Sequence, residues 1–271
     1  MKTFALFLLL LLPGVGARAA PPGGALAAAW QLLANYRPDQ ALPKFEQLST
    51  HGGADARPAR LGSALSLLAQ PSTVPDRVAK ARALLAGLAA DGADDSALAA
   101  QFYLARLAEF QAEPPDPVQA AAGFERLIAG HPDSIWAQAA VPRLAILLLY
   151  TAAGPADPAA RVAAAEHLEG AAREPPAVME LHLVIADAIF HHRLPDAGAL
   201  PHLVAAERAG GMDAATRADV LTQIAELSRL GGHPEQAERY YRIFLAEYPR
   251  DARQYPIRQQ LASLGAAKPA P

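Results

Sequence analysis

The sequence predicts an all-α fold in which about six helix pairs follow one another along the chain. Proline or glycine stands at nearly every break between helical segments, and no run alternates apolar and polar residues in the manner of a β-strand. A small alanine, followed four residues later by a large apolar residue, recurs in the second helix of each pair, where it lets a neighbouring helix pack closely. The marker alanines are Ala41, Ala81, Ala120, Ala164, Ala199 and Ala237. Their spacing of 35 to 44 residues is typical of an α-solenoid, in which each pair packs against the next.

The first three pairs are bounded by residues that start and stop helices. Pro38, Pro75 and Pro117 suit a first helical position, where the missing N–H removes no helical hydrogen bond. Asp95 and Asp116 are expected to cap the two helices of the third pair, because a carboxylate at that place accepts hydrogen bonds from free backbone N–H groups. The expected helices are 25–36, 38–50, 61–69, 75–90, 96–111 and 117–129.

The last three pairs are less regular. Pro142 is expected to kink or break the first helix of the fourth pair, which starts at Ser134. Pro176 follows its marker alanine at the same distance as Pro132 and Pro249 follow theirs in the third and sixth pairs. The remaining expected helices are one that opens at Pro158 and carries Ala164, Leu168 and Ala171, then 178–191, 196–209, 213–230, 234–248 and a capping helix at 256–264.

The N-terminal segment has the pattern of a secretory signal peptide. Lys2 precedes an apolar run at 4–12, and Ala17 and Ala19 form a small-residue cleavage pattern, so we expect cleavage after Ala19 and a periplasmic or secreted protein. The alternative is an uncleaved membrane anchor, but the run is shorter than the about 18 residues that a span needs. The expected organisation is a signal peptide at 1–19, a linker at 20–24, an α-solenoid at 25–264 and a disordered tail at 265–271.

Composition and motifs exclude several classes of function. The chain has no cysteine, which removes disulfides, thiolate metal sites and cysteine nucleophiles. The formal net charge is -3 and no basic cluster is present, so nucleic acid is not an expected partner. There is no glycine-rich phosphate loop and no serine-nucleophile motif. We therefore expect neither a cofactor nor an enzymatic activity.

Histidines are the only side chains in the sequence that suggest a metal site. Half of the chain's 8 histidines lie between residues 182 and 202, namely His182, His191, His192 and His202. No two of them are spaced i, i+4 on one expected helix with a third ligand nearby, which is the usual pattern for a metal-binding helix. They are expected to be solvated or to cap helices, and no metal ligand is predicted.

Two units carry the same ordered motif. The sixth unit has Leu221, Ile224-Ala225, Ala237, Tyr241, Phe244 and Pro249, and the third has Leu104, Leu107-Ala108, Ala120, Phe124, Leu127 and Pro132. This order resembles the tetratricopeptide repeat (TPR) family, and segments 124–134 and 240–249 look most like exported bacterial TPR proteins of the Tol-Pal and outer-membrane-assembly systems. The resemblance implies a right-handed α-solenoid of about six TPR-like helix-turn-helix pairs with a C-terminal capping helix. It also implies a non-catalytic protein that binds a segment of another envelope protein or assembles with its own copies.

In that family the concave face is lined by first-helix positions that flank the buried ones. The corresponding partner-binding positions here are Phe102, Glu109, Ile146, Leu149, Leu181, Val184, Asp219, Glu226 and Arg229. A groove that is apolar in its middle and charged at one end suits an amphipathic or extended peptide. A second interpretation is that the middle of the stack is simply more buried. The expected function is a non-enzymatic protein-protein interaction scaffold in the cell envelope; the alternative is a helical accessory domain of a cell-wall enzyme, which would bind peptidoglycan.

Overall fold

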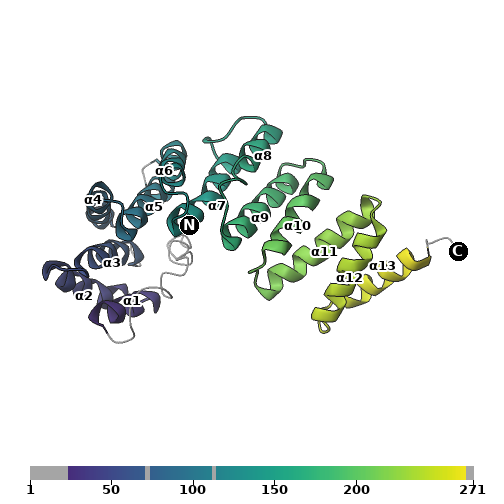
Figure 1. Ribbon diagram of the computed structural model, residues 1–271, viewed down its shortest axis with the longest axis horizontal. Coiled ribbons are helices and arrows are strands. Elements are labelled where there is room, and N and C mark those ends of the chain that lie inside the picture. Colours follow the sequence, from purple (N-terminus) through teal and green to yellow (C-terminus); the bar gives the residue numbers. More distant parts are fainter. Residues whose placement is uncertain (1–23, 71–73, 112–113, 267–271) are drawn as a thin grey trace. The chain divides into compact units, whose positions relative to one another are not determined.

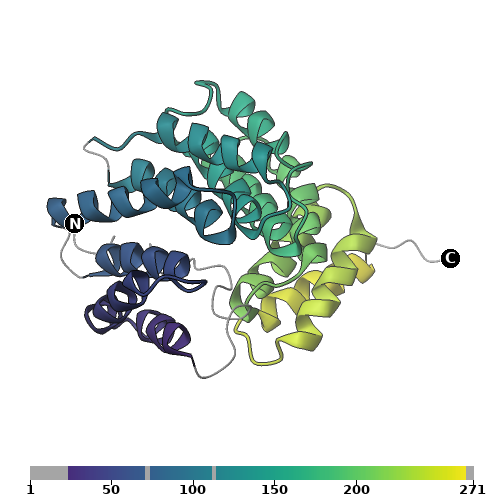
Figure 2. The same ribbon diagram turned by 60° about the vertical axis from the view of Figure 1, so that its left-hand side comes forward.

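The computed structural model describes residues 24–70, 74–111 and 114–266. Over these residues the chain is all-helical, with thirteen α-helices, one short 3-10 helix and no strand (Figure 1 and Figure 2). The expected signal peptide at 1–19, most of the expected linker and residues 267–271 of the expected tail lie outside the described residues. None of the described helices is both long and apolar enough to cross a membrane.

The chain divides into two compact units, with the boundary inside one helix. Unit 1 is Met1–Ala140 and unit 2 is Val141–Pro271. The described helices that lie wholly within unit 1 are α1 (Ala25–Ala34), α2 (Pro38–Thr50), α3 (Ala56–Ala69), α4 (Pro75–Ala90), α5 (Asp95–Phe110) and α6 (Pro117–Gly130). Helix α7 (Ile135–Tyr150) contains the boundary. Unit 2 then has α8 (Pro158–Glu166), α9 (Pro175–His191), η1 (Asp196–Gly198), α10 (Ala199–Ala209), α11 (Ala214–Leu230), α12 (Pro234–Glu247) and α13 (Gln254–Ala266).

The helix boundaries in unit 1 agree with the expected ones to within two residues, except that α3 begins at Ala56 rather than at residue 61. Helices α2 and α4 begin and end at the expected residues, each with proline in its first turn. Asp116 caps α6, as expected, by accepting a hydrogen bond from the Gln119 N–H at 2.8 Å. The expected cap of α5 is wrong by one residue, because Asp94 accepts from the Ala97 N–H at 2.9 Å. Asp95 instead begins the helix.

Unit 2 shows where prolines and short turns change the expected helices. Helix α7 continues through Pro142 and neither stops nor restarts there. Helix α8 ends at Glu166. Its fully buried alanine is Ala165, whereas the expected marker Ala164 is only half-buried. The tenth expected helix divides into η1 and α10. Helix α13 extends to Ala266 and includes the first two residues of the expected tail.

Neighbouring helices pack in chain order inside each unit. In unit 1, α1 to α6 each contact the next, and α1 also contacts α3 while α3 contacts α5. In unit 2 the same order holds from α8 to α13. Five of the six marker alanines are fully buried: Ala41, Ala81, Ala120, Ala199 and Ala237. Small residues at these positions allow the helices to approach closely while the aromatic or leucine four residues later fills the adjacent space.

Candidate functional site

First helices of successive pairs contact each other in unit 1. Arg57, at the start of α3, donates from Nε to Asp94 Oδ2 at 2.6 Å, and the two residues are 37 positions apart. Trp136 of α7 donates from Nε1 to Asp95 Oδ1 at 2.8 Å across 41 positions. The second helices also meet, since Lys80 Nζ of α4 lies 3.1 Å from Glu46 Oε1 of α2, 34 positions earlier. Equivalent helices of successive pairs are therefore in contact, and the contacting residues are separated in sequence by nearly the period of the marker alanines.

Helices α7 and α9 make the corresponding contact in unit 2. The Tyr150 hydroxyl donates to Asp187 Oδ2 at 2.7 Å, and these residues are 37 positions apart. Arg143 of α7 and Glu180 of α9 each lie seven residues before these two residues. Partial desolvation raises the pKa of the Glu180 carboxyl, and the positive charge of Arg143 opposes that shift. The influence of Arg143 on Glu180, in the same chain order as the Tyr150–Asp187 hydrogen bond, agrees with a parallel arrangement of the two helices. Both interactions have the same separation in sequence.

Three of the apolar residues predicted to bind a partner are core residues. Phe102 is 3% exposed, and its ring packs 5.4 to 5.7 Å from the rings of Tyr103, Phe124 and Trp136. Leu149 and Leu181 are fully buried. Their placement agrees with the second interpretation of the sequence pattern, that these positions are apolar because they are buried.

Two other predicted apolar residues, Ile146 and Val184, remain partly exposed. Ile146 lies one turn before Tyr150 on α7, and Val184 lies three residues before Asp187 on α9. Residues three or four apart share a face of a helix. The hydrogen bond between Tyr150 and Asp187 therefore places Ile146 on the face of α7 that is turned toward α9, and Val184 on the face of α9 that is turned toward α7.

The charged residues of the predicted set are paired within the chain. Glu109 accepts from Arg106 at 3.0 Å, and both side chains are almost fully buried. Asp219 of α11 pairs with Arg253 at 2.6 Å. Glu226 pairs with Arg229 at 2.9 Å and also accepts a hydrogen bond from the Tyr241 hydroxyl. Each of these ion pairs lies within one unit. A partner that bound these charged side chains would have to compete with the existing ion pairs.

The four histidines between 182 and 202 fall into two groups. His191 and His192 lie beside the Tyr150 ring, at centroid distances of 5.2 and 5.8 Å, and Nε2 of His192 is 3.0 Å from the Leu149 carbonyl oxygen. These two side chains help to join the ends of α7 and α9. His182 and His202 lie on adjacent helices of the pair α9 and α10, with their Nδ1 atoms 3.0 Å apart.

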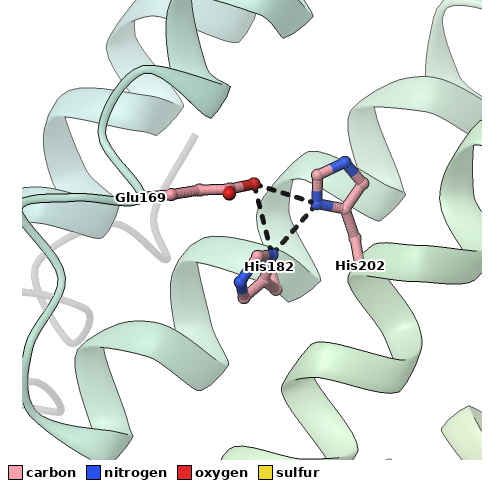
Figure 3. Close-up of side chains that lie close together, drawn as sticks. All are labelled: Glu169, His182 and His202. Atoms are coloured by element: carbon pink, nitrogen blue, oxygen red, sulfur yellow. Dashed lines mark hydrogen bonds and ion pairs between the residues drawn. The ribbon is translucent and has the colours of Figure 1, made fainter.

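A glutamate completes a three-residue cluster with His182 and His202 (Figure 3). Glu169, in the turn after α8, directs Oε1 to within 3.8 Å of His182 Nδ1 and 3.7 Å of His202 Nδ1. The histidine side chains are 12% and 8% exposed, whereas that of Glu169 is 45% exposed. Burial lowers the pKa of His182, with Glu169 opposing this shift and His202 adding to it. The cluster is open to solvent on its carboxylate side.

The sequence does not reveal this cluster, because its members come from three separate elements. Glu169 follows α8, His182 is in the first half of α9 and His202 is in α10. A search for two ligands on one helix cannot detect such an arrangement, and Glu169 has no distinctive sequence context. Only the packing of α8 and α10 against α9 brings the three side chains together.

Comparison with known proteins assigns no family to the chain. No protein-family model matches it, and a search of curated proteins finds no significant match.

Proposed function

We propose that this chain is a non-enzymatic scaffold of the bacterial cell envelope, built from stacked TPR-like helix pairs, that binds a segment of a partner protein. The observation that carries the proposal is the recurrence of contacts between like helices at separations of 34 to 41 residues. Such a stack leaves one side of each first helix at the surface, where a peptide can lie across several helices.

The proposed contact surface in unit 2 is centred on Ile146 and Val184. Both side chains are apolar and partly exposed, and they come from two first helices that are joined by a hydrogen bond. A surface of this kind suits an apolar or amphipathic segment, because burying the two side chains gains free energy in proportion to the apolar area removed from water. Leu149 and Leu181 support the surface from the core rather than contacting the partner.

Export supports the choice of an envelope partner. The charge-poor apolar run at 4–12 and the small residues before Ala20 have the pattern of a cleavable signal. The two units contain no disulfide because the chain has no cysteine, so their stability depends on the packed alanine and leucine faces. The proposed place of action is the periplasm of a Gram-negative bacterium.

Site-specific photocrosslinking in living cells tests the proposed surface. A photoreactive phenylalanine analogue replaces Ile146 or Val184 in the full chain, and a third variant carries it at Val204. Val204 is a matched control because it is also a partly exposed apolar residue of unit 2 but lies on a second helix, α10. We expect the same protein adduct from positions 146 and 184 and little of it from position 204.

A double change, Ile146→Asp and Val184→Asp, examines the same surface without a crosslinker. We expect the variant to keep its helical circular dichroism and to lose the partner identified by crosslinking, because a charge buried in an apolar contact is costly. Equal adducts at all three positions, or none at 146 and 184, would contradict the proposal. Binding to purified peptidoglycan without any protein adduct would instead favour an accessory domain of a cell-wall enzyme.

A further inference from the structure

The cluster of Glu169, His182 and His202 has the composition of a transition-metal site. Two imidazole nitrogens and one carboxylate oxygen are a ligand set that Zn²⁺ takes in proteins, usually with water in a fourth position. The three donor atoms lie on separate elements, so helix packing holds them in place rather than one flexible segment. Figure 3 shows all three side chains pointing toward one common space between α9, α10 and the turn after α8.

The distances between the donor atoms fit a single small cation. His182 Nδ1, His202 Nδ1 and Glu169 Oε1 form a triangle with edges of 3.0, 3.7 and 3.8 Å. The point equidistant from these atoms is about 2.0 Å from each, which matches the about 2.0 to 2.2 Å of zinc–nitrogen and zinc–oxygen bonds. That point lies in the plane of the three atoms. A tetrahedral ion needs all its donor atoms about 3.3 Å apart, so the two rings would separate, and Glu169 would approach each ring, by a few tenths of an ångström.

Glu169 makes no hydrogen bond to either histidine ring of the cluster. Its oxygen is 3.7 and 3.8 Å from the two Nδ1 atoms, beyond hydrogen-bond distance. The His182–His202 contact at 3.0 Å needs only one ring proton, and it makes no use of the carboxylate. A cation between the three atoms would use all of them.

Glu166 orients His202 from the other side of its ring. Its Oε1 lies 3.3 Å from His202 Nε2; in the tautomer with the proton on Nε2, this nitrogen donates to the carboxylate and the Nδ1 lone pair faces the cluster. A histidine that ligates a metal commonly donates its other N–H to a carboxylate in this way. Glu166 ends α8, three residues before Glu169, so the same turn supplies the ligand and the orienting group.

We propose that Glu169, His182 and His202 bind one transition-metal dication, for which Zn²⁺ is the best fit, with Glu166 as the residue that positions His202. The 45% exposure of Glu169 leaves an entry path and room for water as the fourth ligand. Binding would fasten the turn after α8 to α9 and α10, and so stabilise unit 2. This inference is independent of the proposed scaffold function.

Zinc binding by the purified full chain, carrying no histidine tag, tests the site. Competition against a chromophoric chelator measures affinity and stoichiometry, and thermal melts with and without Zn²⁺ measure stabilisation. We expect one Zn²⁺ per chain and a higher melting temperature with the ion. Co²⁺ in its place is expected to show the visible absorption of a tetrahedral site.

Four variants separate this site from general binding to surface histidines. His182→Gln is expected to abolish the tight site, and Glu169→Gln, at an exposed position that tolerates substitution, to weaken it by about tenfold or more. Glu166→Gln is expected to weaken it by about 10- to 100-fold while leaving the stoichiometry at one. His233→Gln removes an exposed histidine of unit 2 outside the cluster and should bind zinc like the unchanged protein.

Two results would overturn the proposal. One is the absence of zinc binding and thermal stabilisation in the unchanged chain. The other is equal affinity in Glu169→Gln, His182→Gln and His233→Gln, which would show that zinc binds elsewhere. Circular dichroism in the presence of a chelator checks that each variant is folded, and the exposed Glu169→Gln variant keeps the test valid if His182→Gln does not fold.

Discussion

Phe124 shows how one side chain can fix the position of a helix pair. It is fully buried in unit 1, its ring centroid lies 5.5 Å from that of Phe102, and it shares a face of α6 with Ala120 and Leu127. The alanine brings the first helix of the pair close, and the aromatic ring fills the space beside it. Loss of the ring would leave a cavity that neighbouring aromatic side chains can only partly fill.

We predict that Phe124→Ala lowers the free energy of unfolding by about 3–5 kcal/mol, because it removes a fully buried aromatic side chain. Val118→Ala, on the same helix but 58% exposed, should change it by less than about 0.5 kcal/mol. Chemical denaturation monitored by circular dichroism measures both. Similar losses in the two variants would show that the assigned buried face of α6 is wrong.

Residue-level features were predictable where the cause is local. Asp116 and the prolines at the starts of α2, α4 and α6 act on the backbone within one turn, so their effect can be read from the sequence. Asp94 and Asp95 could not be distinguished in this way. The choice depends on Arg57 and Trp136, distant partners that bind one carboxylate each. Glu169 likewise becomes recognisable only through its distance from two histidines.

At the level of elements, the connection between α12 and α13 is held by a cluster around Arg253. The guanidinium donates to both carboxylate oxygens of Asp251, at 2.9 and 2.7 Å, and to Asp219 of α11 at 2.6 Å. The side-chain hydrogen bonds from Arg253 are the main cause that lowers the pKa of Asp251, to about 2. The segment that precedes α13 is thus fastened to α11 by ionic contacts.

Arg253→Gln is predicted to raise the pKa of Asp251 toward its ordinary value of 3.8, because the hydrogen-bonded positive charge is lost. The folded-state pKa of Asp251 lies below the unfolded-state value. The interaction therefore stabilises the fold above about pH 4, and the effect is lost as the pH falls toward 2. Carboxyl NMR titration measures the shift, with Asp213 as a control whose lowered pKa comes mainly from Thr216. An unchanged Asp251 pKa would contradict this account.

The lengths of individual helices were harder to predict than their existence. Pro142 normally disfavours a helix interior, yet α7 continues through it because the helix is buried along most of its length and tertiary packing outweighs the local cost. Helix α8 is shorter than expected: it ends at Glu166, and the turn that follows brings Glu169 close to His182 of α9 and His202 of α10. Both outcomes depend on neighbours that are distant in sequence.

At the level of the whole molecule, the period of the marker alanines predicted which helices would meet. Contacts between like helices occur within unit 1 and within unit 2 at separations of 34 to 41 residues, against an expected period of 35 to 44. A periodic pattern reports the packing of neighbouring repeats because each repeat buries its apolar face on the next. It carries no information on side chains such as Phe102 and Leu181, whose apolar character fits a core position as well as a binding surface.

The central claim is that first helices of successive pairs stack in register. Because the chain has no natural cysteine, introduced pairs can be crosslinked specifically with a short bis-maleimide. Tyr150→Cys/Asp187→Cys joins two positions in contact across α7 and α9, whereas Tyr150→Cys/Glu180→Cys is displaced by seven residues, or about 10 Å along α9. We predict rapid intramolecular crosslinking of the first pair and slow crosslinking of the second, measured by mass spectrometry; equal rates, or a faster second pair, would contradict the stack.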